Sequence, residues 1–271
     1  MLRIGTFVPT TAAAGSAAYP LAHSIPPPSV SLATNALAPV QGLVADGLSI
    51  PRTRSDMLIG GLCASFFFLC GAPLSLIAGL ACDGNSRVRL SLYAGCISTL
   101  ALIAHAAAHH LAVLLVARAL LGACVGSLVP ISASLIGDLV HSAERPRYAS
   151  FAGLSAGLGG AVGMLAMGGV GHLAGGWRAA FLAYGVAVLC SSCLVWQVAV
   201  EPPREGLRCD PPSGRDTEGA SRADGAMLKA LRQAAADLRA VMRVPTNCIV
   251  YAQSLAGTLP WSVVAVFLPV E

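Results

Sequence analysis

Charged side chains are scarce in this chain, and a first group of them stands between two long apolar runs, where it could form ion pairs. Within the stretch Gly79–Arg89, Asp83 and Arg87 follow Gly79 at intervals of four residues. The Asp83 carboxylate could face the positive N-terminus of a helix, and Arg87 could reach an acid at a neighbouring helix end. Charges placed so abruptly beside apolar runs predict a tight turn at a membrane surface.

A second group of charges follows a later apolar run and comprises Asp138, Glu144 and Arg145. The two acids are possible partners for Arg87 or Arg145, and we hypothesise that Arg87 pairs with Asp138. A solvated turn without such a pair is the simpler alternative.

Arg118 lies inside an apolar run that spans residues 111–140. A guanidinium at that depth is costly and usually functional, so it must face a bundle interior or extend to the membrane surface. Gly122 and Gly126 follow it at helical spacing and would let another helix approach closely. The remaining titratable groups in the predicted spans are His105 and His172. Either could relay protons or bond to a backbone carbonyl.

Other chemistries find no support in the sequence. It contains no Gly-x-x-x-x-Gly-Lys-Ser/Thr loop for nucleotide phosphates, and no His, Cys and Asp cluster with metal spacing outside the apolar runs. The Cys190–Cys193 pair has redox spacing but lacks a second pair and lies within a span, which favours a structural role. We therefore expect no cofactor, no metal and no enzymatic activity.

The elements that must position these residues are transmembrane helices. The chain is 55% hydrophobic and only 11% charged, whereas soluble domains carry about a quarter charged residues. Runs of about 20 apolar residues predict membrane spans. The clear candidates are residues 56–82, 90–108, 111–140, 149–175 and 178–200, and weaker ones are residues 29–45 and 247–268. The predicted fold is an all-α membrane protein with a six-helix bundle and a seventh helix.

The predicted domains follow from this pattern. Residues 1–28 form a poorly ordered leader, residues 29–200 the bundle, residues 201–244 a polar loop, and residues 245–271 a truncated seventh helix. Leucines at spacings of three and four predict an amphipathic helix over residues 226–243. That helix could lie on the membrane face or brace two halves of a transporter. Basic residues in alternate loops place the N-terminus in the cytoplasm.

Glycines and a tryptophan mark the last two helices of the bundle. Gly157, Gly159 and Gly163 predict close helix packing in the fifth helix. Trp177 and Arg178 precede the sixth, where the tryptophan is expected to anchor the span at the water interface and the arginine to cap the junction.

Several of these motifs, in this order, resemble the major facilitator superfamily. They are the loop Gly-x-x-x-Asp-x-x-x-Arg over 79–87, Arg118-x-x-x-Gly122 in the fourth helix, the glycine-rich fifth helix, and Gly176-Trp-Arg-x-x-Phe181. Gly84 and Ser86 depart from the usual loop pattern. In that family the charged loop is a latch that stabilises the outward-facing state, and the fourth-helix arginine lines the central cavity.

Two further stretches resemble Spinster-like members of the superfamily. They are residues 253–261, which include Gln253 and Trp261, and Asn35-Ala-Leu-Ala-Pro39 in the first span. The acid that such proteins carry after the fourth-helix glycines is absent, because Gly122-Ala-Cys-Val125 stands there, which puts proton coupling through that carboxylate in doubt. The resemblance implies that Arg118, Gln253 and Trp261 are candidates for binding substrate or a coupling ion.

The resemblance implies a secondary active transporter of a small organic solute or lipid-like molecule that works by alternating access. Its C-terminal half would be missing from this sequence, to be supplied by further chain or a second chain. The alternative is a short membrane protein that transports nothing and associates with a full-length transporter. The expected partners are the lipid bilayer and an unidentified substrate, with no nucleic acid.

Overall fold

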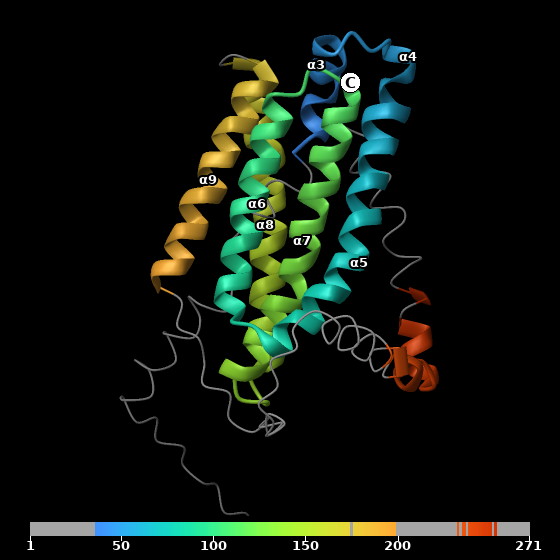
Figure 1. Ribbon diagram of the computed structural model, residues 1–271, viewed down its shortest axis with the longest axis vertical. Coiled ribbons are helices and arrows are strands. Elements are labelled where there is room, and N and C mark those ends of the chain that lie inside the picture. The colour runs from blue at the N-terminus through green and yellow to red at the C-terminus, as the bar shows by residue number, and fades with distance from the viewer. Residues whose placement is uncertain are drawn as a thin grey trace, which may run out of the picture. The chain divides into compact units, whose positions relative to one another are not determined.

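The computed structural model describes residues 36–173, 176–198, 232, 235, 236, 238–250, 252 and 253 (Figure 1). By their internal contacts the residues form two compact units, Met1–Pro202 and Pro203–Glu271. Five helices of the first unit are long and apolar enough to cross a membrane. The all-α membrane fold predicted from the sequence is therefore confirmed.

The first described elements are short. They are the 3₁₀ helix η1 (Ala38–Val40), which begins next to Pro39, then α3 (Gln41–Gly47) and α4 (Arg52–Ser55). The π-helix η2 (Asp56–Leu62) follows α4 directly and continues into α5 (Cys63–Gly84). Together α4, η2 and α5 form one span, Arg52–Cys82, which begins four residues before the predicted start. Of the predicted first span, residues 29–35 lie outside the described residues.

The other long helices are α6 (Arg87–Ala106), α7 (Leu111–Leu139), α8 (Arg145–Leu173) and α9 (Gly176–Val198). Consecutive helices run in opposite directions, so the α5–α6 and α7–α8 connections share one end of the bundle (Figure 1). We name this the Arg87 end. The α6–α7 and α8–α9 connections share the other, which we name the Trp177 end.

Two helix starts differ from the prediction. The side chain of Ser86 accepts a hydrogen bond from the Arg89 backbone N–H at 3.3 Å and caps α6. Arg87 and Arg89 therefore lie in the first turn of α6, although the sequence placed them in the preceding loop. Likewise α8 begins at Arg145 instead of residue 149, because the basic turn itself is helical.

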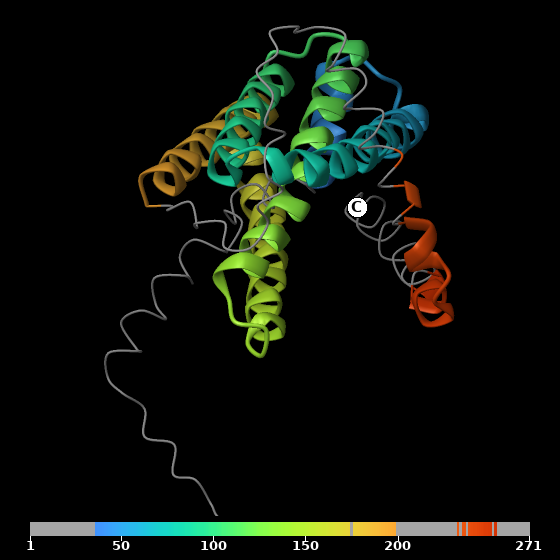
Figure 2. The same ribbon diagram turned by 60° about the horizontal axis from the view of Figure 1, so that its bottom comes forward.

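The tightest packing in the bundle is between α5 and α7, which run in the same direction along the bundle (Figure 1) and cross each other (Figure 2). A Cβ atom added to Gly122 would lie 2.1 Å from the Phe67 carbonyl oxygen, and one added to Gly126 would lie 2.4 Å from that of Gly71. Backbone therefore meets backbone over two turns at these two glycines. In lipid, such close approach replaces the hydrophobic effect as a source of stability.

The glycines of α8 differ from one another. Gly157 has nothing within 4 Å of an added Cβ, so the close packing predicted there is wrong. Gly159 and Gly163 are buried, and the Gly163 carbonyl oxygen accepts a hydrogen bond from the Tyr184 hydroxyl on α9. One face of α8 thus packs on α9, whereas Gly157 faces outward.

The second unit is helical in the residues that can be described. Residues 238–242 are helical, a turn follows at Arg243, and residues 245–250 form another helix that begins at Pro245. Asn247 Nδ2 donates to the Val241 carbonyl oxygen at 3.1 Å across this turn. The described residues before Arg243 fall within the predicted amphipathic helix, which stays a prediction. Most of the predicted seventh helix lies outside the described residues.

The glycine contact generates a stability prediction. Replacing Gly122 or Gly126 with alanine forces a methyl group into the backbone of α5, so we expect the free energy of unfolding to fall by about 1–3 kcal/mol. Thermal unfolding in detergent, followed by circular dichroism, measures the change. Gly157→Ala is the matched control, because its methyl group meets open space and alanine favours a helix. Equal melting temperatures for all three variants would contradict the contact.

Candidate functional site

At the Arg87 end, an ion pair joins the start of α6 to the end of α7. Arg87 Nη1 contacts Asp138 Oδ2, so the structure brings together the two residues that the sequence suggested as partners. The Arg87 side chain is only 9% exposed, whereas that of Asp138 is 42% exposed. Water therefore reaches one side of the pair while the guanidinium is held against the bundle.

Arg145 acts on the same helix end, and among the described residues it has no acidic partner. Its Nε donates to the Val140 carbonyl oxygen at 3.1 Å, and its Nη2 donates to that of Gly137 at 2.7 Å. These bonds satisfy carbonyl groups that the last turn of α7 would leave unpaired. The expected pairing of Arg145 with an acid is thus replaced by a helix cap, and the Glu144 side chain is exposed.

Gly79 and Asp83 are the remaining residues of the loop that the sequence predicts to act as a latch. An added Cβ on Gly79 would lie 3.8 Å from Pro130 Cβ, which is an ordinary contact. Glycine is therefore not needed there for close approach within the bundle. The side chain of Asp83 lies outside what the structure describes.

Arg118 lies on the face of α7 that packs against α5, one turn before Gly122. It is 3% exposed and interacts electrostatically with Cys63 on α5 and His105 on α6. The guanidinium is thus enclosed by three helices of the bundle. The alternative that it extends to the membrane surface does not fit this burial.

His105 is fully buried next to Arg118. Its Nδ1 donates to the Ala101 carbonyl oxygen at 2.7 Å, and its ring stacks on Phe181 of α9 with centroids 5.0 Å apart. The sequence allowed His105 either to relay protons or to bond to a backbone carbonyl, and the hydrogen bond to a backbone carbonyl is present. His172, by contrast, is exposed in the last turn of α8.

At the Trp177 end, the tryptophan points into the bundle. Trp177 is 5% exposed, packs edge-to-face on Phe181, and its Nε1 would lie 2.8 Å from a Cβ added to Gly47. The predicted anchor at the water interface is therefore wrong for this side chain, which instead holds α9 against α3. The large apolar ring gains more from burial in the core than from the interface.

Arg178 contacts the junction of α6 and α7, whereas the sequence analysis placed its cap at the junction that precedes α9. Its Nη2 donates to the Ala108 carbonyl oxygen at 2.8 Å, and its guanidinium lies 4.4 Å from the centroid of the Trp177 ring. The side chain thus ties the start of α9 to the loop that follows α6.

Sequence reasoning missed a polar cluster near the start of the second span. Gln41 is buried, and its Nε2 donates to Asp56 Oδ1 at 2.8 Å, while Ser55 Oγ donates to the same oxygen at 3.2 Å. An ion pair of 2.9 Å between Arg52 and Asp46 closes the preceding loop. Asp56, an acid at the first residue of an apolar run, was the signal in the sequence that could have revealed this cluster. Its partner Gln41, however, is 15 residues away in the chain.

The remaining candidates lie in the second unit. Gln253 is helical and exposed, and Trp261 lies outside the described residues. Within the described ranges, no group of three His, Cys, Asp or Glu side chains could hold a metal ion.

Comparison with known proteins adds a family and a fold. The family described as Major Facilitator Superfamily matches residues 28–270. The fold is similar to a solved structure of a bacterial homolog of the human lysosomal transporter Spinster, in an inward-facing and unoccupied conformation. The TM-score is 0.57 at 17% identity, over 77% of this chain and 46% of that one. The present chain thus spans about half the length of that transporter. No curated protein matches the sequence.

The ion pair at the Arg87 end generates a second prediction. In a double-mutant cycle of Arg87→Gln and Asp138→Asn, we expect a coupling free energy of about 1–2 kcal/mol, between the values for exposed and buried pairs. Thermal unfolding of the two single variants and the double variant gives this value. Arg89→Gln is the control, because Arg89 is exposed in the same turn. Additive effects of the two substitutions would show that the pair contributes nothing.

Proposed function

The chain belongs to the Major Facilitator Superfamily, and on that premise we propose that it forms one helical bundle of a secondary active transporter. Its substrate would be a small organic solute or a lipid-like molecule, moved by alternating access. The Arg87–Asp138 ion pair is the observation that most supports this role. Because water reaches one side of the pair, it could break and re-form as that end of the protein opens and closes.

Arg118 takes a supporting part in the proposal. Enclosed by α5, α6 and α7, it would contact a substrate only if those helices moved apart. We therefore assign it a positioning role in this conformation, because its buried side chain lies where α5, α6 and α7 meet. Gln253 and Trp261 stay proposed cavity residues on the strength of the sequence alone.

Transport would need a second bundle. In transporters built from repeated halves, substrate binds near the middle of the membrane where the halves meet. The described helices supply one such half, and we propose that further chain or a second chain supplies the other. The positive charges at the Arg87 end would place that end in the cytoplasm.

A second role is favoured by one observation. Of the five spans, α8 is the least buried, which leaves much of its surface without contacts in the bundle. Such a surface could associate with a full-length transporter, in which case the chain would modulate transport without performing it.

The proposed role generates a transport prediction. The protein is purified from its native membrane under mild conditions, so that any associated chain is retained, and reconstituted into liposomes. We expect uptake of at least one member of a radiolabelled panel of amino acids, sugars, organic ions and lysophospholipids. Arg87→Gln and Asp138→Asn should each slow that uptake about tenfold, which corresponds to about 1.4 kcal/mol in the barrier.

Arg89→Gln serves as the control and should leave the rate unchanged, because its exposed side chain lies in the same turn as Arg87. If well-folded wild-type protein takes up no member of the panel, the associating role is favoured over transport. If transport occurs but survives both ion-pair substitutions at full rate, the latch is wrong while the transporter assignment stands.

A further inference from the structure

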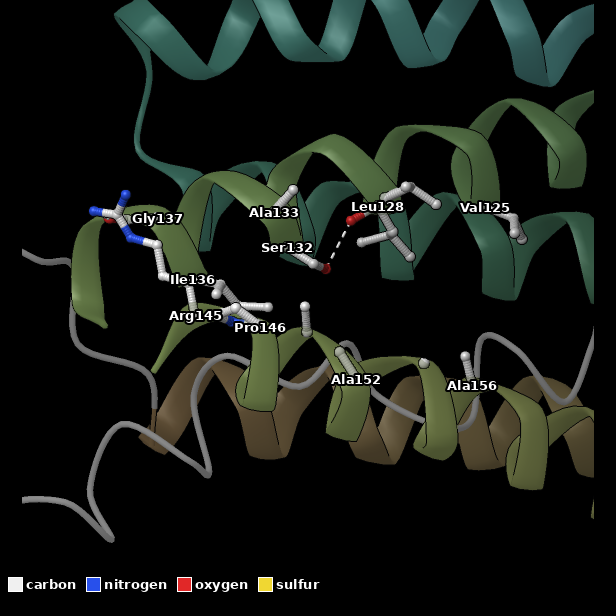
Figure 3. A pocket seen from close by; sticks show the side chains of 13 residues that line it. Val125, Leu128, Ser132, Ala133, Ile136, Gly137, Arg145, Pro146, Ala152 and Ala156 are labelled. Carbon is white, nitrogen blue, oxygen red and sulfur yellow. Dashed lines mark hydrogen bonds between the residues drawn. The ribbon is translucent and has the colours of Figure 1, made fainter. Parts of the chain in front are cut away.

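A groove of about 580 Å³ lies between α7 and α8 in the half of the bundle nearer the Arg87 end (Figure 3). Its volume falls within the range of roughly 300–1,000 Å³ that is typical of small-molecule sites. The side chains along it include Val125, Leu128 and Ile136 of α7 and Pro146, Ala152 and Ala156 of α8. Nothing in the proposed transport role uses this groove.

The walls of the groove suit a hydrocarbon. Its lining is almost entirely aliphatic, and the hydroxyl of Ser132 is already engaged, because Oγ donates to the Leu128 carbonyl oxygen at 2.7 Å (Figure 3). A polar ligand would therefore find little to bond with along the walls. An apolar ligand loses nothing by entering.

The length of the groove matches one leaflet of a membrane. On α7 its lining runs from Val125, at the middle of the helix, to Gly137 near the end. At the rise of an α-helix this distance is about 18 Å, slightly more than half of a hydrocarbon core of about 30 Å. The groove thus extends from the middle of a bilayer to its surface.

The shape of the groove suits an extended chain. A volume of about 580 Å³ extends over about 18 Å of α7, so the groove is long relative to its width and an extended hydrocarbon chain can follow it. Occupation of the groove by a helix of a second copy is one of the outcomes of the test below.

The charge at the surface end selects the head group. Arg145 lines that end, and its bonds to the Val140 and Gly137 carbonyl oxygens fix the guanidinium while leaving other N–H groups at the exposed mouth. Arg147 lies in the same first turn of α8, with its guanidinium 5.8 Å from the centroid of the Phe151 ring. Against these two cations stands the exposed acid Glu144, since Asp138 is paired with Arg87. A phosphate suits this mouth.

We propose that the α7–α8 groove binds one acyl chain of an anionic phospholipid, with the lipid phosphate held by Arg145. The lipid would be a resident of the membrane that fills the space between two weakly packed helices. Its binding does not depend on whether the protein transports a solute.

Lipid retention by the full chain tests the site. The purified protein is equilibrated in micelles with equal amounts of phosphatidylglycerol and phosphatidylcholine that carry identical acyl chains. Native mass spectrometry then counts the lipid that remains bound. We expect about fivefold more phosphatidylglycerol than phosphatidylcholine, the ratio that about 1 kcal/mol from one arginine produces.

Two variants separate the chain from the head group. Ala152→Phe fills the groove and should lower the retention of both lipids about fivefold. Its control is Ala161→Phe, on the opposite, exposed side of α8, which should retain lipid as the wild type does. Arg145→Gln should abolish the preference for phosphatidylglycerol, whereas Arg89→Gln should preserve it. Circular dichroism checks that each variant is folded.

Three results would overturn the proposal. They are equal retention of the two lipids by the wild type, equal retention by Ala152→Phe and Ala161→Phe, or a lipid-free dimer that Ala152→Phe dissociates. The first removes the head-group assignment, the second removes the groove as the site, and the third gives the groove to a second copy. Arg145→Gln also removes the hydrogen bonds that cap α7 and could destabilise the protein. The comparison of Ala152→Phe with Ala161→Phe does not depend on that variant.

Discussion

The direct contact of two helix backbones, α5 and α7, is the constraint on which the bundle depends. Lipid surrounds a membrane protein with a solvent as apolar as its own side chains, so burial of leucine gives little reason for helices to associate. Close van der Waals contact gives a reason, and the absence of side chains at Gly71, Gly122 and Gly126 permits it. Because the two helices run in the same direction, the contact also fixes their register, with Cys63 beside Arg118 one turn earlier.

Polar side chains in the bundle form hydrogen bonds with backbone groups at the helix ends. Arg145 covers the last carbonyl groups of α7, Arg178 covers the carbonyl of Ala108 after α6, and Ser86 begins α6. These contacts fix the connections between successive helices. An apolar medium favours them, because no water is present there to bond with the free backbone groups. The arginines thus act as much through the backbone as through ionic partners.

Much of this organisation could be predicted from the sequence, and the failures have two causes. Apolar run lengths gave the long helices to within a few residues, and the glycine spacing in 122–126 indicated the closest contact. The Arg87–Asp138 pair was also foreseeable, because Arg87 precedes one apolar run and Asp138 ends another, which places both at the same end of the bundle. The burial of Trp177 and Gln41 was not foreseeable. Whether such a side chain points into the bundle depends on neighbours that are distant in sequence, here Gly47 for Trp177 and Asp56 for Gln41. The cap formed by Arg145 was missed because basic residues beside a span suggest loops, whereas these begin a helix.

The π-helix η2 has a consequence for how the second span should be aligned with others. A π-helical segment holds an extra residue relative to the α-helix around it. Asp56, at its start, therefore faces Gln41, while Phe67, beyond its end, faces α7 on a line displaced from that of a continuous α-helix. A helical wheel drawn through residues 52–84 as one continuous α-helix therefore places the residues at one end of the span on the wrong face. In a relative without the bulge, the matching span would be one residue shorter and yet present the same two faces, so a gap belongs within 56–62 and not in a loop.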